Sequence, residues 1–172
     1  MRHFAAVLFF GLLASPLYAQ DPASTANSRG GCGLSEVQYD VTTSKDHPAP
    51  RPEGGKALVY VIEDIERGPT MLVGVDGAWV GANKGKSYIF FPVDPGDHQV
   101  CTRWQSSVFK KTAERIGSAA AVKAEAGKAY YFRIQVYERS EHDRSVKLEP
   151  VEAPEGEFLV SSSKFSTSRP KK

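Results

Sequence analysis

The chain has little of what a reactive or membrane-bound protein needs. It contains only two cysteines, Cys32 and Cys101, among 172 residues. The apolar run of residues 4–14 is too short for a helix that crosses a bilayer, which needs ~20 residues, and no other segment is apolar for long enough. No G-x-S-x-G segment is present, and no two histidines have the H-x-x-x-H spacing of a zinc-binding helix. We therefore expect no catalytic residues, no metal ligands, no cofactor and no membrane span, and the protein is not expected to be an enzyme.

The charge is also small and its distribution is informative. The sequence holds 22 basic and 20 acidic residues, for a formal net charge of +2. Four of the basic residues and none of the acidic ones lie after Phe158. The remainder of the chain after residue 19 is faintly acidic. A nucleic-acid-binding domain would gather basic side chains on one face, so nucleic acid is excluded as a partner.

The first nineteen residues are typical of an export signal. Arg2 precedes the apolar run of residues 4–14, and Ser15 and Pro16 break the helix before a cleavage site after Ala19. The first cysteine, Cys32, lies well beyond this run, so no lipid anchor is expected. These features predict a periplasmic or secreted protein.

The two cysteines predict a disulfide between Cys32 and Cys101. Exported proteins fold in oxidising compartments, where a pair of thiols forms a bridge. Closing a loop of this length stabilises a fold by about 4 kcal/mol in the chain-entropy model. A redox pair would favour a C-x-x-C spacing, and a metal site would need further ligands.

Short apolar runs separated by turn residues predict an all-β protein. We expect a single antiparallel β-sandwich, immunoglobulin-like or prealbumin-like, because no helical pattern of 10 to 15 residues separates the runs. The expected boundaries are a disordered leader at residues 20–35, the sandwich at 36–160 and a basic flexible tail at 161–172. The expected strands are residues 36–42, 56–63, 71–75, 88–93, 98–104, 118–124, 129–138 and 146–151.

Local patterns refine this picture. Residues 56–63 are apolar on both faces, which is typical of a central strand. Asp76-Gly77 predicts a two-residue hairpin turn. Residues 118–124 and 129–138 are expected to pair as a hairpin, and residues 72–101 to form a β-meander. Gln105–Gly117 is either a loop or one helical turn, and Glu155–Phe165 is expected to form a short helix or strand.

Three patterns in the sequence suggest binding. Residues 81–87 resemble a phosphate loop, but only three residues separate the two glycines and a strand follows instead of a helix. The histidines stand beside turn residues, where exposed structural roles are common. Exposed tryptophans bind sugars or peptides, and Trp79 and Trp104 are the candidate ligand contacts, with a role in the core as the competing interpretation.

Several motifs resemble a known bacterial family. The resemblance is carried by the motifs GKALVYVI, V-D-G-x-x-V-G, S-Y-x-x-F, P-x-x-P-G-x-H-x-V and A-G-K-x-Y-Y-F-R-I. It is to a bacterial domain-of-unknown-function family, number twenty-eight forty-six, and covers roughly residues 56–151. The VDG…PGDH part also resembles a PEGA-like β module. The resemblance implies an exported β-sandwich of the bacterial cell envelope and supplies no catalytic residues.

The sequence thus predicts a non-catalytic, exported β-sandwich that acts as a binding or structural module of the cell envelope. Its partner is expected to be an envelope protein or a glycan, with strand addition as one mode of association. The alternative is a carbohydrate- or peptidoglycan-binding domain that uses Trp79 or Trp104. The ligand, the oligomeric state and the choice between periplasm and exterior do not follow from the residues.

Overall fold

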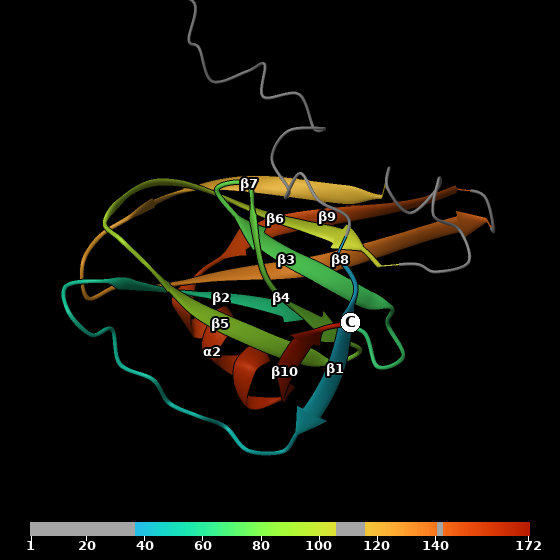
Figure 1. The fold of residues 1–172 in the computed structure, drawn as a ribbon, viewed down its shortest axis with the longest axis horizontal. Helices are drawn as coiled ribbons and strands as arrows, with labels where there is room; N and C mark the ends of the chain where they lie inside the picture. The colour runs from blue at the N-terminus through green and yellow to red at the C-terminus, as the bar shows by residue number, and fades with distance from the viewer. Residues whose placement is uncertain (1–36, 106–115, 141–142) are drawn as a thin grey trace, which may run out of the picture.

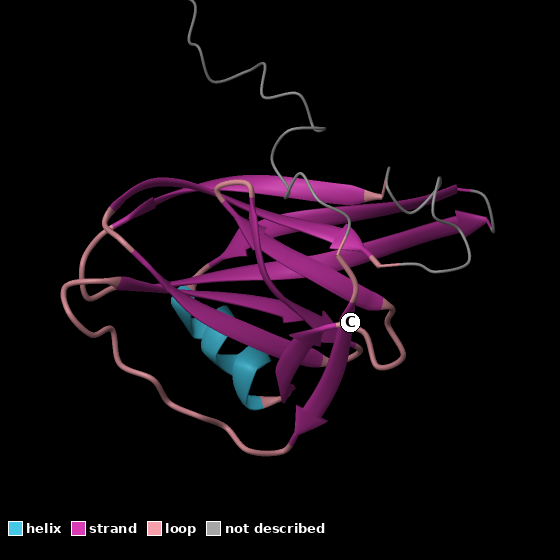
Figure 2. Ribbon diagram, in the orientation of Figure 1, coloured by secondary structure: helices cyan, strands magenta, loops and turns pink. Residues whose placement is uncertain are grey.

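The computed structural model describes residues 37–105, 116–140 and 143–172, which contain ten strands and one helix (Figures 1 and 2). The elements are β1 (Tyr39–Ser44), β2 (Ala57–Glu63), β3 (Thr70–Val75), β4 (Ala78–Lys84), β5 (Ser87–Val93), β6 (Gly96–Trp104), β7 (Gly117–Ala124), β8 (Ala129–Ser140), β9 (Asp143–Val151), α2 (Ala153–Ser161) and β10 (Lys164–Pro170). The expected signal, the leader and most of Gln105–Gly117 lie outside the described residues.

The strands form two sheets, so the expected all-β class is confirmed. One sheet has six strands in the order β1-β10-β5-β2-β8-β9, and the other has four in the order β4-β3-β6-β7. The expectation of purely antiparallel pairing is wrong. β2 pairs with β8 in parallel, and β10 pairs with β5 in parallel. The chain passes through the four-stranded sheet between β2 and β8, and such a crossover permits parallel pairing where a tight turn would not.

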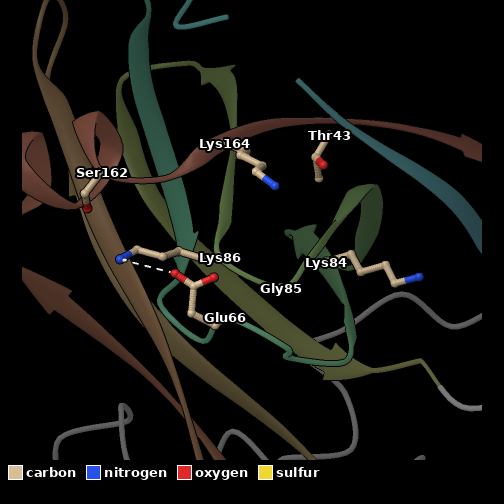
Figure 3. A pocket seen from close by; sticks show the side chains of 7 residues that line it. All are labelled: Thr43, Glu66, Lys84, Gly85, Lys86, Ser162 and Lys164. Atoms are coloured by element: carbon tan, nitrogen blue, oxygen red, sulfur yellow. Dashed lines mark ion pairs between the residues drawn. The ribbon is translucent and has the colours of Figure 1, made fainter. Parts of the chain in front are cut away.

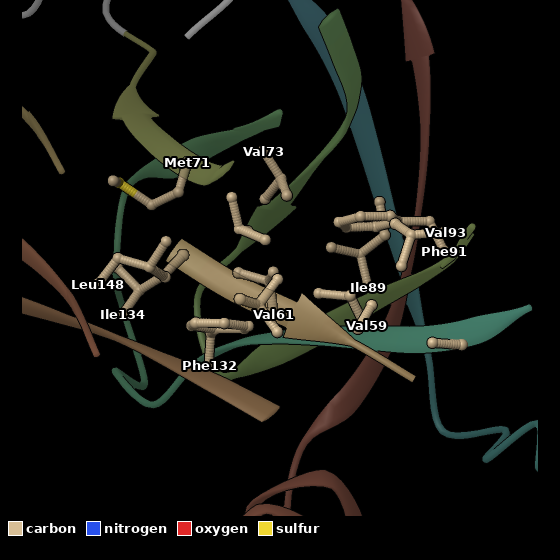
Figure 4. Close-up of a cluster of buried hydrophobic side chains, with 14 of the residues drawn as sticks. Val59, Val61, Met71, Val73, Ile89, Phe91, Val93, Phe132, Ile134 and Leu148 are labelled. Carbon is tan, nitrogen blue, oxygen red and sulfur yellow. The ribbon is translucent and has the colours of Figure 1, made fainter. Parts of the chain in front are cut away.

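The main core lies between the two sheets (Figure 4). Alternate residues of β2 and β8 point into it, including Val59, Val61, Phe132 and Ile134, and β3 contributes Met71 from the opposite layer. β2 is central in its sheet, as expected, because β5 and β8 flank it. All seven of its residues are buried. This strand therefore lies at the centre of the fold.

The outer face of the six-stranded sheet is covered by α2. Leu159 of the helix packs on Leu58, Tyr60, Ile62 and Tyr88. The rings of Tyr60 and Tyr131 stack with centroids 5.0 Å apart. Pro154 stands in the first turn of the helix, where its missing N–H costs no intrahelical hydrogen bond. Both faces of β2 are thus apolar because a layer covers each of them.

The hairpin predicted at Asp76-Gly77 is confirmed. It joins β3 to β4, and the two turn residues have φ angles of 50° and 81°. Both angles lie in the left-handed region that the tight hairpin turn requires, and aspartate and glycine are among the residues that adopt it most readily.

Two expected connections are wrong because the chain changes sheets at each. β4 lies in the four-stranded sheet and β5 in the six-stranded sheet, so residues 72–101 do not form a meander. β7 pairs with β6, whereas β8 pairs with β2 and β9, so β7 and β8 are not hairpin partners. The turn between them is held by β2, because Leu58 N donates to Lys128 O at 2.9 Å. Local patterns show the strands, but contacts distant in sequence choose their partners.

The C-terminal residues are not the flexible tail that the sequence suggests. After α2 the chain forms β10, which lies between β1 and β5 in the six-stranded sheet. Ser166 is only 1% exposed, and its hydroxyl donates to Ser87 Oγ at 2.7 Å. The polar composition of this segment hides a strand whose small hydroxyl side chains fit a polar part of the interior. The folded unit therefore extends to residue 170.

Candidate functional site

The two candidate tryptophans lie on different faces of the four-stranded sheet. Trp104 pairs with Met71 across β6 and β3, and both side chains pack against the main core. Trp79, on β4, packs instead with Leu72 and Tyr39 on the outer face. The two rings therefore do not form one aromatic platform, and a single flat ligand would contact one of them at most.

Each tryptophan is half-buried and has an arginine over its ring. The guanidinium carbon of Arg103 lies 4.9 Å from the centre of the Trp79 ring, and that of Arg144 lies 5.4 Å from the Trp104 ring. Such cation–π contacts stabilise by about 0.5–1 kcal/mol at exposed sites. A sugar stacking on either ring would have to share or displace this arginine. The candidate role of both tryptophans stays a prediction.

Cys101 is fully buried in β6, on the face opposite Val100. Its predicted partner, Cys32, lies outside the described residues. The disulfide therefore stays a prediction as well.

His98 is built into a contact between two turns. Its Nδ1 lies 2.6 Å from Asp76 Oδ2, and its Nε2 lies 2.6 Å from the carbonyl oxygen of Asp94. The hydrogen bond to Asp76 raises the pKa of His98, and the carbonyl of Asp94 acts in the same direction. Burial works to raise the pKa of Asp76, but hydrogen bonds from His98 and Gln99 outweigh it, so that pKa lies below its usual value. The imidazole ring joins the β3–β4 turn to the β5–β6 turn.

A buried acid that the sequence interpretation did not single out lies at the end of β2. Glu63 is 0% exposed, and it follows Val59 and Val61 on the face that points between the sheets. Neither carboxyl oxygen has a hydrogen-bond partner among the described residues. Burial raises the pKa of Glu63 to about 9, while the nearby N–H of Gly85 acts in the opposite direction. The carboxyl group is therefore neutral at pH 7.

Asn83 borders the same part of the interior. Its amide nitrogen donates to Val61 O at 2.9 Å and to Ser87 O at 3.4 Å. Ser87 is the cross-strand partner of Glu63, so Asn83 and Glu63 approach one strand pair. The carboxamide oxygen of Asn83 is buried and, within the described part of the chain, makes no hydrogen bond.

A strongly raised pKa in a carboxyl group often marks a functional site. Here the group is enclosed, so a substrate cannot reach it in this conformation. The local signal was present in the sequence: in the strand KALVYVIE, strict alternation places Glu63 on the same face as Val59 and Val61. It was missed because the last residue of a strand usually reaches solvent.

A small pocket of about 130 Å³ lies over the turn between β4 and β5 (Figure 3). It is lined by Thr43, Glu66, Lys84, Gly85, Lys86, Ser162 and Lys164. The Lys86 ammonium is 3.8 Å from Asp64 Oδ1 and 4.0 Å from Glu66 Oε1. The side chain of Lys84 points away from the ion pair of Lys86 and Glu66 in Figure 3. The pocket thus has mixed charge, and its lysines do not converge on one point.

The same pocket bears on the segment that resembled a phosphate loop. Residues 84–86 form the turn from β4 into β5, and a strand follows, as the sequence predicted. The N–H of Lys84 is used by Ser87 Oγ at 3.1 Å. A phosphate loop presents its N–H groups to the ligand at the start of a helix, so this turn has a different geometry.

Across residues 37–105, 116–140 and 143–172, no three His, Cys, Asp or Glu side chains are grouped so that they could hold a metal ion. The helix in this part of the chain is too short to span a bilayer.

Comparison with known proteins gives no further assignment. No family model, no curated protein and no solved structure matches this chain. The resemblance to the exported domain-of-unknown-function family and to the PEGA-like module therefore stays a prediction from the motifs.

Proposed function

We propose that this chain is a non-catalytic β-sandwich domain, exported and acting as a binding or structural module of the bacterial cell envelope. The observation that carries the proposal is the way the polar side chains are used. His98 joins two turns through both ring nitrogens, and Arg133 joins β8 to β9 and to α2 through Glu149 and Glu155 at 2.9 Å and 2.7 Å. These groups serve the scaffold.

The export part of the proposal rests on the signal pattern of residues 1–19 and on the cysteine pair. It is tested by expressing the full chain in a bacterial host, separating the cell fractions and measuring the intact mass. We expect a chain that begins at Gln20 in the exported fraction and that is lighter by two hydrogens than its reduced form. An uncleaved cytosolic chain, or two free thiols in the exported protein, would contradict the proposal.

The binding part is tested by adding the purified, folded wild-type chain to an envelope extract of that host and cross-linking it, with a heat-unfolded sample of the same protein as the control. A defined envelope protein cross-linked only to the folded chain supports it.

The alternative function, a carbohydrate- or peptidoglycan-binding domain, depends on Trp79 or Trp104. Since the rings lie on different faces, Trp79→Ala and Trp104→Ala are expected to have separate effects in a peptidoglycan pull-down. Loss of retention in one variant, with a normal melting temperature, would favour the glycan role. If both variants are retained as well as the wild type, or if the wild type is not retained at all, the glycan role is eliminated.

A further inference from the structure

The four edge strands of the two sheets differ in how their outer backbone groups are used. β1 and β9 are the edges of the six-stranded sheet, and β4 and β7 are the edges of the four-stranded sheet. An edge strand exposes a row of N–H and C=O groups to which another strand can bind, and proteins usually block such edges.

Side chains occupy part of the edges of β1 and β4. The side-chain amide of Gln105 accepts from Tyr39 N at 2.7 Å and donates to Tyr39 O at 2.9 Å, on the free side of β1. On β4, Ala82 N donates to Ser168 Oγ of β10 at 3.0 Å. Neither edge offers an uninterrupted row of groups.

The edge of β9 is also blocked. Leu148 N points away from β8 and donates to Ser118 Oγ of β7 at 2.9 Å. Pro150, two residues later on the same side, has no N–H at all. A strand added here would meet two interruptions within three residues.

Among the described residues the outward backbone groups of β7 have no such protection, although the side chain of Ser118, on the inner face of the strand, contacts β9. Trp104 N donates to Ile116 O, and this bond sets the alternation of the β6–β7 ladder. Residues at even positions bond to β6, so the N–H and C=O groups of Gly117, Ala119, Ala121 and Lys123 point outward. Within the described part of the chain, these outward groups have no backbone hydrogen-bond partner. The register with β6 is unbroken from Gly117 to Ala124, and the strand contains no proline.

We propose that β7 pairs antiparallel with β7 of a second copy of this chain, about a two-fold axis through Ala120. The two four-stranded sheets then continue into one sheet of eight strands. The inference rests on the proposed function, since it names a second copy as a partner of the binding module.

The distribution of charge favours a second copy. In the register centred on Ala120, Ala119 lies opposite Ala121 of the other copy and Lys123 lies opposite Gly117. The two Lys123 side chains stand at opposite ends of the pairing, six residues or ~20 Å apart at the usual rise per residue. That separation exceeds the Debye length of about 8 Å at physiological ionic strength. The strand is therefore complementary to itself without repulsion between like charges.

The shape of the edge argues against selection of a foreign peptide. Domains that bind peptides by strand addition gain specificity from pockets for alternate side chains. The exposed side chains of β7 are two methyl groups, a glycine and one lysine, which form no pockets. The edge supplies backbone hydrogen bonds, about eight in the proposed register, and little else. Because this contact is small, we expect a weak dimer with a Kd in the micromolar range, as for other small interfaces.

The proposal is tested by analytical ultracentrifugation of the mature, oxidised chain from ~1 µM to ~1 mM, a range that brackets the expected Kd. The wild type should shift from monomer to dimer over this range. The double variant A119K/A121K places two like-charged pairs directly opposite each other, so association should weaken about tenfold. The matched variant A119K/A121E places lysine opposite glutamate in both pairs and should dimerise at least as well as the wild type.

Both variants change only exposed side chains, and a melting curve checks that each is folded. A monomeric wild type at every concentration would overturn the proposal. Equal dimerisation of A119K/A121K and A119K/A121E would also overturn it, because another surface would then be responsible. Either failure leaves the export and cross-linking results of the proposed function unaffected, so the two proposals can fail separately.

Discussion

The β2–β5 strand pair ends in a polar cluster on each side, and the two clusters handle charge in opposite ways. At one end Ala57 pairs with Val93, and the turns beyond them hold His98 between Asp76 and Asp94. At the other end Glu63 pairs with Ser87, and its carboxyl group lies in the interior without a hydrogen bond to any described residue. One end keeps its ions and pairs them near solvent, whereas the other neutralises its acid by burial.

The difference shows what each cluster contributes. A hydrogen-bonded ion pair with partial exposure adds modest stability and fixes the geometry of the turns. A buried acid held neutral makes stability depend on pH over a wide interval, because the unfolded chain ionises where the folded chain does not. The buried neutral acid changes stability more than the ion pair does, so changes at Glu63 should have the larger effects on the free energy of unfolding.

The largest effect is expected for Glu63→Gln. The folded pKa is about 9 and the ordinary pKa of glutamate is 4.5, so the wild type loses stability as pH rises between these values. The loss should be on the order of several kcal/mol between pH 5 and pH 9. The glutamine variant cannot ionise and should lose much less. Urea unfolding at pH 5, 7 and 9 measures this.

Glu66→Gln, at an exposed acid three residues away, is the control and should keep the wild-type pH dependence. A wild type whose stability is constant from pH 5 to pH 9 would show that Glu63 is not a buried neutral acid.

Gly68→Ala should have the next largest effect. A Cβ at this position would lie 1.9 Å from Glu63 Oε1 and 2.9 Å from its Cδ. Because Glu63 is fully buried, its side chain must displace packed neighbours to make room, and we expect a loss of about 1–3 kcal/mol. In a Glu63→Ala background the obstacle is gone, so Gly68→Ala should cost little there. Unfolding of both single variants and the double variant measures the coupling; simple additivity of the two changes would contradict the contact.

The smallest effect is expected at the paired end, for Asp76→Asn. Asparagine tolerates the positive φ of this turn but removes the charge beside His98. The pKa of His98 should fall, as an NMR titration of its ring would show. The stabilisation from the raised pKa is full below the unfolded value of 6.5 and is lost as pH rises through the folded value. Since Asp76 is half-exposed, its loss should be under about 1 kcal/mol. An unchanged pKa of His98 would show that His98 and Asp76 do not form this hydrogen bond in solution.

The paired end was more accessible to sequence reasoning than the buried end. Asp76-Gly77 and Pro95-Gly96 are turn signals that act within a few residues, so the strands on either side of them were predicted. The hydrogen bond between His98 and Asp76 was not, because the two residues lie 22 positions apart in the chain. For Glu63 the only sequence signal was the alternation that places it on the same face as Val59 and Val61. Whether the end of a strand is buried depends on which loop covers it.

The C-terminal strand shows the same limit. Residues 164–170 carry one large apolar side chain and five hydroxyl or basic ones, a composition typical of a solvated tail. β10 nevertheless lies between β1 and β5, because its backbone completes two ladders and Ser166 reaches Ser87 inside. Backbone pairing of this kind leaves almost no mark on composition.

By itself the sequence determined the class of the protein: the strands, the Asp76-Gly77 hairpin and the central place of β2 follow from apolar alternation and turn chemistry, which act over a few residues. The tertiary structure alone decided which strands pair, where the chain changes sheets, that residues 164–170 form a strand and that Glu63 is enclosed. These outcomes depend on contacts between segments distant in the chain, where many pairings satisfy the same local pattern and the whole packed arrangement selects one.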